Sequence, residues 1–321
     1  MCLLAVDLGG TKLALALFNE NGDLLREQKV LLDKREGAEV GVLVVESIER
    51  FIDEQKETRS PVSSIGISIP GIYHRKEGTA WVPNIAGWGN YPLLKEVQAV
   101  VRDIPVSIDS DRSCYILGEQ WKGAAKNCNH AIFLAVGTGI GAGILVDGTI
   151  LRGANDIAGA TGWMALQHPF SPDYIECGCF ESTASGAGIG KLAKKMMLEK
   201  EGYGGVLKAK LPNLTATNVF DAYDAGDIIA KQVVQHCIET WGMAIANLVS
   251  LFNPEKIILG GGVFGPAIKF IPLIYEEAKK WAQPVSMKQV TLEPSALDGR
   301  AGLYGAAYLA LQNNKILSIH E

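Results

Sequence analysis

The stretch Asp7-Leu8-Gly9-Gly10-Thr11-Lys12 has a counterpart about 130 residues later, Val136-Gly137-Thr138-Gly139-Ile140-Gly141-Ala142-Gly143. Each stretch lies between two apolar runs that are typical of β-strands. A tight glycine turn between strands exposes backbone amides, and glycine has no side chain that would keep phosphate oxygens away. The two turns therefore predict two similar domains that bind one polyphosphate.

The composition is typical of a soluble globular protein. The chain has 321 residues, of which 48% are hydrophobic and 20% charged, and this length favours two domains. A net charge of −5 without a basic block argues against nucleic acid as a partner. The apolar run at the N-terminus stops at Asp7 and follows no basic segment, so we expect a buried strand there and no signal peptide.

No apolar run is long enough to cross a membrane. The six cysteines are scattered apart from Cys177 and Cys179, and we expect reduced thiols in the cytoplasm. A zinc site at these two cysteines is the alternative, but zinc needs about four ligands and only His168 lies nearby among the histidines.

The first half predicts the order β-β-β-α-β-α-β followed by a helix. Asn21-Gly22 between apolar runs indicates a hairpin, and residues 72–92 are expected to form loops. The expected elements are three strands within 3–32, a helix at 38–56, a strand at 64–69, a helix at 93–101, a strand at 106–108 and a helix from about 111.

The second half begins in the same way and then becomes mainly helical. Loops are expected at 152–183, and the last helix is expected to pack back on the first domain. The expected elements are strands at 131–136, 142–146 and near 149–151, helices at 184–199, 214–223 and 225–252, a strand at 257–259, a helix at 266–281, a strand at 289–292 and a helix at 300–312.

Carboxylates follow two of the predicted strands. Asp7 is either a ligand of Mg²⁺ or of a metal-bound water beside nucleotide phosphates, or a residue that caps the turn. At Asp109-Ser110-Asp111, one carboxylate is a candidate general base for a substrate hydroxyl. Ser110 or Asp111 equally fits a helix N-cap.

The other glycine clusters allow two interpretations each. Gly137-Thr138-Gly139-Ile140-Gly141 resembles a dinucleotide fingerprint in its spacing, but a strand follows it and a nicotinamide site needs a helix. Gly260-Gly261-Gly262 lets the backbone approach a flat ligand such as adenine, or forms a tight strand-to-helix turn.

These motifs, in this order, resemble the ROK family of bacterial sugar kinases and sugar-responsive repressors, over nearly the whole chain. The motifs that carry the resemblance are Asp-Leu-Gly-Gly-Thr-Lys at 7–12, Ile-Pro-Gly-Ile at 69–72, Val-Pro-Asn-Ile-Ala-Gly-Trp at 82–88, Asp-Ser-Asp-Arg-Ser at 109–113 with Leu-Gly-Glu at 117–119, Gly-Thr-Gly-Ile-Gly-Ala-Gly at 137–143, Gly-Cys-Phe-Glu at 178–181, Gly-Gly-Gly-Val-Phe at 260–264 and Gly-Leu-Tyr-Gly-Ala-Ala at 302–307.

The resemblance implies an α/β fold with two actin-like ATPase (ribonuclease H-like) domains and an interdomain cleft. We expect a smaller N-terminal domain of residues 1–115 plus 300–321 and a larger C-terminal domain of residues 116–299. It further implies a cytoplasmic, ATP- and Mg²⁺-dependent sugar kinase, glucokinase-like and usually a homodimer, with no nucleic-acid or membrane partner.

The resemblance also assigns roles to residues. The family pattern Asn-Asp-Ala-Asn before Leu-Gly-Glu makes Asp111 the catalytic base, which takes a proton from the sugar hydroxyl. The implied sugar-binding residues are Asn84, Ser110, Asp111, Trp163 and Glu181. The implied ATP- and phosphate-binding residues are Asp7, Gly9, Gly10, Thr11, Lys12, Gly137, Thr138, Gly139, Gly141, Gly260, Gly261 and Gly262, and Asp7 binds Mg²⁺ through water.

The chain departs from the family pattern where the sugar and a structural zinc are bound. Ala160 and Trp163 stand where the family has the Glu and His of Glu-Ile-Gly-His, and only Cys179 of the zinc cysteines stays in register. We therefore expect no structural zinc. Trp163 either stacks on a sugar face or fills the place of the zinc, and the substrate is expected to differ from glucose.

Three functions remain open at this point. The first is a hexose kinase, including a kinase of a non-glucose sugar such as an N-acetylhexosamine. The second is a non-catalytic sugar sensor, for which the absence of a DNA-binding segment before Asp7 argues against direct DNA binding. The third is another enzyme on this scaffold, such as an ATPase or a polyol kinase.

Overall fold

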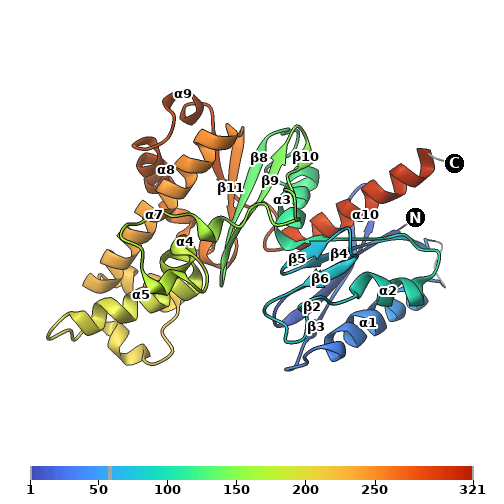
Figure 1. Ribbon diagram of the computed structural model, residues 1–321, viewed down its shortest axis with the longest axis horizontal. Helices are drawn as coiled ribbons and strands as arrows, with labels where there is room; N and C mark the ends of the chain where they lie inside the picture. Colours follow the sequence, from blue (N-terminus) through green and yellow to red (C-terminus); the bar gives the residue numbers. More distant parts are fainter. Residues whose placement is uncertain (1, 57–59, 320–321) are drawn as a thin grey trace. The chain divides into compact units, whose positions relative to one another are not determined.

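A computed structural model describes residues 2–56 and 60–319 and divides the chain into two compact units. Unit 1 comprises Met1–Asn127, Ile150–Ala158 and Ala296–Glu321, and unit 2 comprises Cys128–Thr149 and Gly159–Ser295. Figure 1 shows that the C-terminal helix packs with the N-terminal elements, so unit 1 is built from both ends of the chain. The domain boundaries predicted at residues 115 and 299 stay a prediction.

Unit 1 is built on a five-stranded sheet in the order β3-β2-β1-β4-β7. Strands β1 to β3 form an antiparallel meander, and β4 and β7 continue the sheet parallel to β1. The Asn21-Gly22 turn predicted between β2 and β3 is confirmed, and Gly22 has a φ of +80° there. The strands are β1 (Cys2–Leu8), β2 (Lys12–Asn19), β3 (Leu24–Leu31), β4 (Val62–Ile69) and β7 (Val106–Ser110).

Helices cover both faces of this sheet. The helices are α1 (Ala38–Lys56), α2 (Leu93–Val101), α3 (Asp111–Lys122) and α10 (Ala301–Ile319). Alternate residues of β1 point to opposite faces: Leu4 packs with the α1 and α2 side, and Leu3 with the α10 side. Gly66 lets α10 approach β4 closely, because a Cβ there would lie 1.8 Å from the Ala306 carbonyl oxygen.

Residues 72–92, predicted as loops, contain a short hairpin of β5 (Ile72–His74) and β6 (Thr79–Trp81). The rest of the segment is ordered by Trp88, whose indole N–H donates to the Gly37 carbonyl at 2.8 Å and whose ring stacks on Tyr91. The local pattern that predicts loops here does not show that Trp88 and Tyr91 pair.

Unit 2 repeats the sheet of unit 1. Its strand order is β10-β9-β8-β11-β12, with β8 antiparallel to β9 and parallel to β11. The repeat in topology predicted from the two glycine turns is thus confirmed. The strands are β8 (Ala131–Val136), β9 (Ile140–Val146), β10 (Thr149–Ile150), β11 (Lys256–Gly260) and β12 (Thr291–Pro294).

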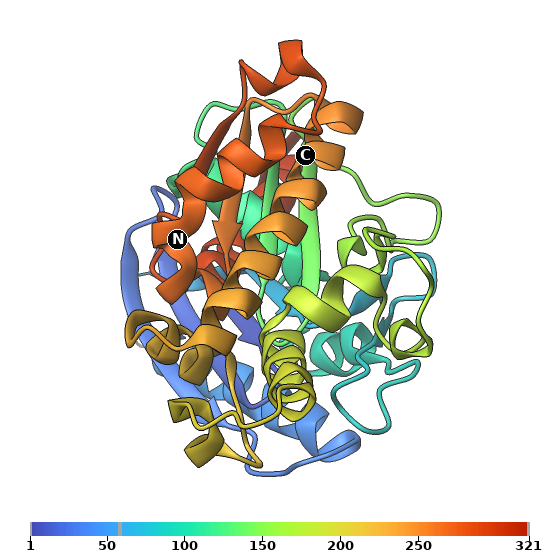
Figure 2. The same cartoon turned by 90° about the vertical axis from the view of Figure 1, so that its left-hand side faces the viewer.

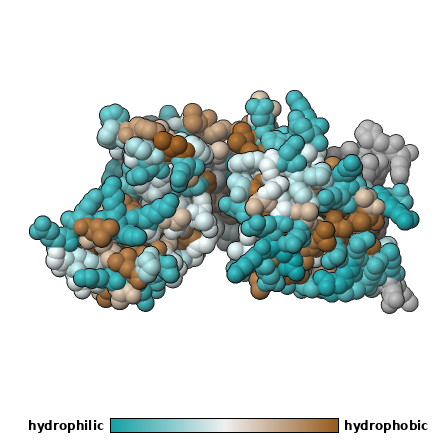
Figure 3. All heavy atoms as spheres, turned by 60° about the horizontal axis from the view of Figure 1, so that its bottom comes forward, coloured by the Kyte–Doolittle hydropathy of each residue, from teal (hydrophilic) through white to brown (hydrophobic). Residues whose placement is uncertain are grey.

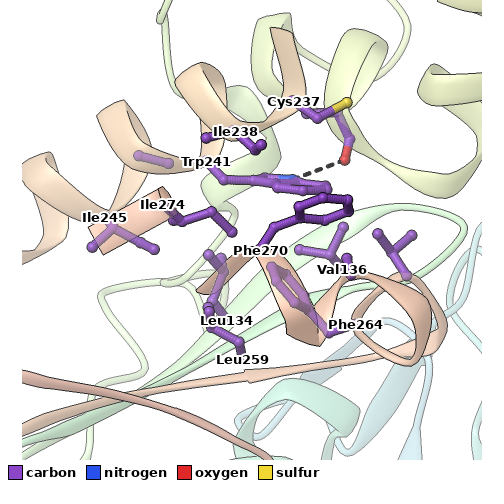
Figure 4. Close-up of a cluster of buried hydrophobic side chains, with 14 of the residues drawn as sticks. Leu134, Val136, Cys237, Ile238, Trp241, Ile245, Leu259, Phe264, Phe270 and Ile274 are labelled. Carbon is purple, nitrogen blue, oxygen red and sulfur yellow. Dashed lines mark hydrogen bonds between the residues drawn. The ribbon is translucent and has the colours of Figure 1, made fainter. Parts of the chain in front are cut away.

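The longest helix, α7, lies across this sheet (Figure 2). Figure 4 shows Trp241 of α7 between the strands and the neighbouring helices; its indole N–H donates to the Ala184 carbonyl at 3.1 Å. The helices of unit 2 are α4 (Cys179–Ala184), α5 (Gly186–Glu199), α6 (Ala216–Asp224), α7 (Ile228–Phe252), α8 (Ile271–Lys279) and α9 (Pro284–Met287), and the 3₁₀ turns are η1 (Thr161–Trp163), η2 (Pro172–Tyr174), η3 (Val206–Lys210), η4 (Gly262–Phe264) and η5 (Pro266–Phe270).

Several boundaries in unit 2 differ from the prediction. The chain becomes helical at Cys179, inside the stretch predicted as loops, and Ser185 separates α4 from α5. Ser185 has an extended backbone and caps α5 by accepting a hydrogen bond from the Gly188 N–H. The separate helix α4 matters because it carries Glu181.

The surface is mixed in character. Figure 3 shows brown apolar residues in small groups among teal hydrophilic ones on both units. None of the helices in the described residues is both long and apolar enough to span a bilayer.

Candidate functional site

The first glycine turn connects β1 and β2 in unit 1. The Gly9 N–H donates to the Lys12 carbonyl at 2.8 Å, which closes the turn, and Thr11 and Lys12 are exposed. A Cβ at Gly10 would lie 4.0 Å from the Cβ of Asn84. The fold of unit 1 therefore brings the predicted sugar-binding Asn84 beside the predicted phosphate turn, although 74 positions separate Asn84 from Gly10 in the sequence.

Asp7 lies at the end of β1, paired in register with Ser68 on β4. Burial raises the pKa of its carboxyl group, while the Ser68 hydroxyl and the Lys12 ammonium act in the opposite direction. On its other side lies Gly302, in the first turn of α10. Asp7 is thus a half-buried carboxylate at the base of the first glycine turn.

Asp111 is the first residue of α3, directly after β7 ends. Its Oδ1 accepts a hydrogen bond from the Arg112 N–H at 2.7 Å, and the Tyr115 hydroxyl donates to its Oδ2 at 3.3 Å. Burial raises the pKa of Asp111 to about 6, although Arg112 lowers it; the charge of Asp7 raises it further. A carboxylate with this pKa is ionised at neutral pH. It remains basic enough to accept the proton of a hydroxyl group that acts as a nucleophile.

Ser110 is the N-cap of α3. Its Oγ accepts from the Ser113 N–H at 3.3 Å and lies 3.1 Å from the Ser113 Oγ. The capping interpretation of the sequence therefore applies to Ser110 and leaves the carboxylate of Asp111 available.

Asp109 is occupied by ion pairs. Its Oδ2 accepts from Arg75 Nη2 at 3.0 Å and from Arg152 Nη2 at 2.8 Å, and its Oδ1 accepts from the Ser110 N–H at 2.8 Å. The side chain is only 7% exposed. Sequence reasoning missed this pair of arginines, because they lie 34 and 43 positions away and carry no motif. Of the two carboxylates at 109–111, Asp111 is the one left for chemistry.

The second glycine turn connects β8 and β9 in unit 2. The Gly137 N–H donates to the Gly139 carbonyl at 2.9 Å, and the Gly137 carbonyl accepts from the Gly186 N–H at 2.7 Å, at the start of α5. Thr138 at the tip is exposed, and Gly141 lies within β9. The turn is therefore attached to α5 through a carbonyl group.

Glu181, in the first turn of α4, contacts the same turn. Its Oε2 accepts a hydrogen bond from the Ile140 N–H at 2.5 Å. Burial raises the pKa of Glu181, and the Ile140 N–H lowers it. This contact between a predicted sugar-binding residue and the phosphate turn had no signal in the sequence.

Trp163 ends η1 and is 58% exposed. Gly178, with a φ of +86°, packs so closely that a Cβ there would lie 2.5 Å from the Trp163 Cα. Ala160 precedes η1 as its N-cap residue, without a side-chain hydrogen bond. The backbone around Trp163 is thus fixed by the residue before Cys179, while the indole stays accessible.

The three glycines after β11 have different surroundings. A Cβ at Gly260 would lie 2.2 Å from the Phe133 ring, and Gly261 has a φ of +88° with its Cβ position 2.4 Å from the Val136 carbonyl oxygen. Among the described residues, no atom outside its own turn lies within 4 Å of the Cβ position of Gly262. Packing against Phe133 thus requires a glycine at position 260, and the backbone conformation of the turn requires one at 261, whereas the Cβ position of Gly262 is open.

The described residues contain no group of three His, Cys, Asp or Glu side chains that fits a metal ion. Cys179 is buried, and the Cys177 Sγ lies 3.4 Å from the Ser182 Oγ. Nearby, the Tyr174 hydroxyl donates to Gln167 Oε1 at 2.9 Å, and the Gln167 amide contacts His236 at 3.0 Å. These hydrogen bonds between neutral groups connect the segment that carries Gln167 and Tyr174 to helix α7.

The predicted site residues thus form two sets, one in each unit. The set in unit 1 consists of Asp7, Gly9, Gly10, Thr11, Lys12, Asn84, Ser110 and Asp111. The set in unit 2 consists of Gly137, Thr138, Gly139, Gly141, Trp163, Glu181, Gly260, Gly261 and Gly262. Each set combines a glycine turn with a carboxylate.

A model of the ROK family matches residues 3–313. The chain belongs to the ROK family. It is 31% identical over 312 residues to a glucokinase of Halalkalibacterium halodurans, covering 96% of this chain and 94% of that protein. The predicted family is therefore confirmed.

Solved structures of the family have the same fold. A ROK family glucokinase from Streptomyces griseus, in complex with glucose and AMPPNP, is 28% identical with a TM-score of 0.77, covering 97% of this chain and 100% of that one. The predicted α/β fold with actin-like ATPase domains is confirmed. The family also includes repressors: a xylose repressor of Caldicellulosiruptor bescii is 28% identical, over 99% of this chain and 80% of that protein.

Proposed function

We propose that this ROK protein is an ATP-dependent sugar kinase. The observation that carries the proposal is Asp111, a carboxylate at the start of α3 whose pKa is raised to about 6 and whose two oxygens are oriented by Arg112 and Tyr115. The relatives of this chain include a glucokinase, and one solved structure of a ROK family glucokinase holds glucose and AMPPNP. These relatives support a sugar as the phosphate acceptor and ATP as the donor.

In the proposed reaction, Asp111 takes the proton of one sugar hydroxyl as the hydroxyl oxygen attacks the γ-phosphorus of ATP. The bond between the γ-phosphorus and the β,γ-bridging oxygen breaks, and ADP leaves in line with the attack. General-base catalysis of this kind contributes typically about 10²–10⁴-fold. Tyr115 keeps the base in place, since its hydroxyl, with a strongly raised pKa, remains a donor.

The glycine turns are proposed to bind the phosphates, through the amides at Gly9–Lys12 and Gly137–Gly139 and the Lys12 ammonium. Gly262 offers room for the nucleoside. Asp7 fits a Mg²⁺ ion that arrives with ATP, because Mg²⁺ keeps most of its waters and commonly takes one or two protein carboxylates beside the phosphates. Bound there, Mg²⁺ supplies positive charge for the phosphate oxygens.

The sugar is proposed to contact Asn84, Ser110, Asp111, Trp163 and Glu181. The chain has Ala160 where the family pattern has a glutamate, and the exposed indole of Trp163 where it has a histidine. Loss of two polar groups disfavours a sugar whose hydroxyls would remain unpaired. We therefore propose a hexose other than glucose, such as an N-acetylhexosamine, as acceptor.

A non-catalytic sugar sensor is the second candidate. Ala160 and Trp163 favour it, because a site can keep sugar binding while losing the contacts that align a hydroxyl for transfer. The repressor relatives show that the family contains proteins named as regulators. For either function we propose a homodimer located in the cytoplasm. Analytical sedimentation of the purified protein tests whether it is a dimer.

The deciding experiment measures ADP release from Mg·ATP across hexoses, N-acetylhexosamines and polyols, with Asp111→Asn beside the wild type. Turnover that depends on one sugar and disappears in the variant establishes the kinase. Binding of a sugar without any sugar-dependent ADP release would favour the sensor.

A further inference from the structure

The carboxylate of Glu181 connects two parts of unit 2 that the sequence separates. Oε2 accepts the Ile140 N–H, and Ile140 is the residue directly after the glycine turn at 137–139. A charge-assisted hydrogen bond from a backbone N–H to a carboxylate is about twice as strong as a neutral one. Glu181 therefore restrains the C-terminal side of the second glycine turn.

Two glycines pack against the carboxylate of Glu181. A Cβ at Gly139 would lie 2.7 Å from Oε2, and a Cβ at Gly162 would lie 2.9 Å from the same oxygen. The carboxylate is thus enclosed by the turn on one side and by η1 on the other. Because both neighbours lack side chains, Oε2 reaches the backbone of Ile140 directly.

The opposite side of the turn is restrained as well. The Gly137 carbonyl accepts from Gly186 at the start of α5. With both sides restrained, the amides of Thr138 and Gly139 at the tip donate to no protein acceptor in the part of the chain that the structure describes. They are the donors that a phosphate would use.

We infer that Glu181 is a positioning residue for the phosphate turn as well as a ligand of the sugar, so that one carboxylate connects acceptor recognition to nucleotide binding. This inference deepens the proposed kinase function and rests on it for the sugar contact. Oε2 supports the turn, while Oε1 accepts no hydrogen bond among the described residues and is available to a sugar hydroxyl. By reciprocity, each ligand is expected to strengthen binding of the other.

The test separates the two roles by nucleotide binding without any sugar. Calorimetric titration with Mg·AMPPNP compares the wild type with Glu181→Ala, Glu181→Asp and Glu181→Gln. Glu181→Ala loses the acceptor for the Ile140 N–H, and Glu181→Asp keeps the charge but falls one methylene short. Both are expected to bind AMPPNP about tenfold more weakly. Glu181→Gln keeps a carbonyl oxygen as acceptor but loses the charge, so it is expected to lose less affinity than Glu181→Ala.

Glu176→Ala is the matched control, because this exposed glutamate lies five positions before Glu181 and makes no hydrogen bond or ion pair to the described residues of the turn. Urea unfolding shows whether each variant is folded. If Glu181→Ala does not fold, the affinity of Glu181→Asp decides the test. AMPPNP affinities within twofold of the wild type for both Ala and Asp would overturn the positioning role and leave the kinase proposal standing. A wild type that binds AMPPNP but phosphorylates no sugar would overturn the kinase proposal alone, and one that binds no AMPPNP would overturn both.

Discussion

The carboxylate of Asp7 packs directly against the backbone of Gly302, in the first turn of α10. A Cβ at position 302 would lie 2.5 Å from Asp7 Oδ2 and 2.8 Å from Oδ1. The C-terminal helix thus packs against one side of the carboxylate that is proposed to bind Mg²⁺.

Gly302→Ala is expected to move Asp7 from its place. The added methyl group meets the carboxylate carbon at 2.7 Å, and a buried strand residue cannot shift without cost. Overpacking of this kind typically destabilises a protein by about 1–3 kcal/mol. The affinity for Mg·AMPPNP is expected to fall tenfold or more, and its dependence on Mg²⁺ to weaken, as measured by titration with and without the metal.

Gly89→Ala is the control, since no atom of the described structure lies within 4 Å of its Cβ position. It is expected to leave both unfolding and AMPPNP binding near wild type. Unchanged affinity for Mg·AMPPNP in Gly302→Ala would contradict a role for the position of Asp7.

The pH dependence of turnover is expected to follow the ionisation of Asp111. The carboxyl group, with a pKa raised to about 6, is protonated and inactive as a base below that pH. We therefore expect kcat/KM for the sugar to rise with pH and to level off above about 7, measured by initial rates between pH 5 and 8.5.

Tyr115→Phe distinguishes Asp111 from other groups that titrate in this range. The Tyr115 hydroxyl donates to Asp111 and lowers its pKa, so its removal raises that pKa. The rise in kcat/KM is then expected to shift to higher pH. A profile that stays in place in this variant would assign the titration to another group.

Asp111→Asn is expected to lose activity and gain stability. Because folding raises the pKa of Asp111 from 3.8 to about 6, the native state binds more protons than the unfolded chain between these values. The contribution of this group to stability therefore falls as the pH rises through about 4 to 6 and stays low above it. The corresponding cost is about 3 kcal/mol at most above pH 7.

Urea unfolding at pH 5 and pH 8 measures this effect. The variant is expected to exceed the wild type in stability by about 1–3 kcal/mol at pH 8 and by about 1 kcal/mol less at pH 5. Asp103→Asn, at an exposed position, is the control variant measured at the same two pH values. An equal gain of Asp111→Asn at both pH values would mean that burial does not raise the pKa of this carboxyl group.

The sequence was most informative where local chemistry determines structure. Asn21-Gly22 specifies a hairpin through the positive φ that Gly22 adopts, and the two long glycine turns do so through their place between apolar runs. The α1 and α2 bounds follow from the spacing of apolar residues. The hairpin of β5 and β6 was missed, because its order depends on Trp88 reaching Gly37, 51 positions away. Local pattern carries no information on such a contact.

In the candidate site too, local sequence patterns predict some features, whereas contacts between distant segments are not predicted. Glycines and Asp111 were identified from spacing and resemblance, but the partners that give them their properties come from distant segments. Examples are Gly302 beside Asp7, Arg152 on Asp109 and Ile140 on Glu181. Sequence motifs identify which groups are present, whereas burial and neighbours determine which carboxylate is free to react.

Trp163→Ala tests the role of the indole that stands where the family pattern has a histidine. The side chain is 58% exposed, so its removal is expected to change the unfolding free energy by no more than about 0.5 kcal/mol. If the indole stacks on the acceptor, the KM for the sugar is expected to rise about tenfold, equivalent to about 1.4 kcal/mol, while AMPPNP affinity without sugar is unchanged.

Trp281→Ala is the matched control, because this tryptophan of unit 2 is 63% exposed and lies outside every predicted site segment. Its removal is expected to leave the KM for the sugar unchanged. A loss of more than about 1 kcal/mol in unfolding free energy for Trp163→Ala, with the sugar KM unaltered, would instead make the indole a structural substitute at the place of the family zinc. The two outcomes separate substrate recognition from loop stability at the position where this chain departs most from its family.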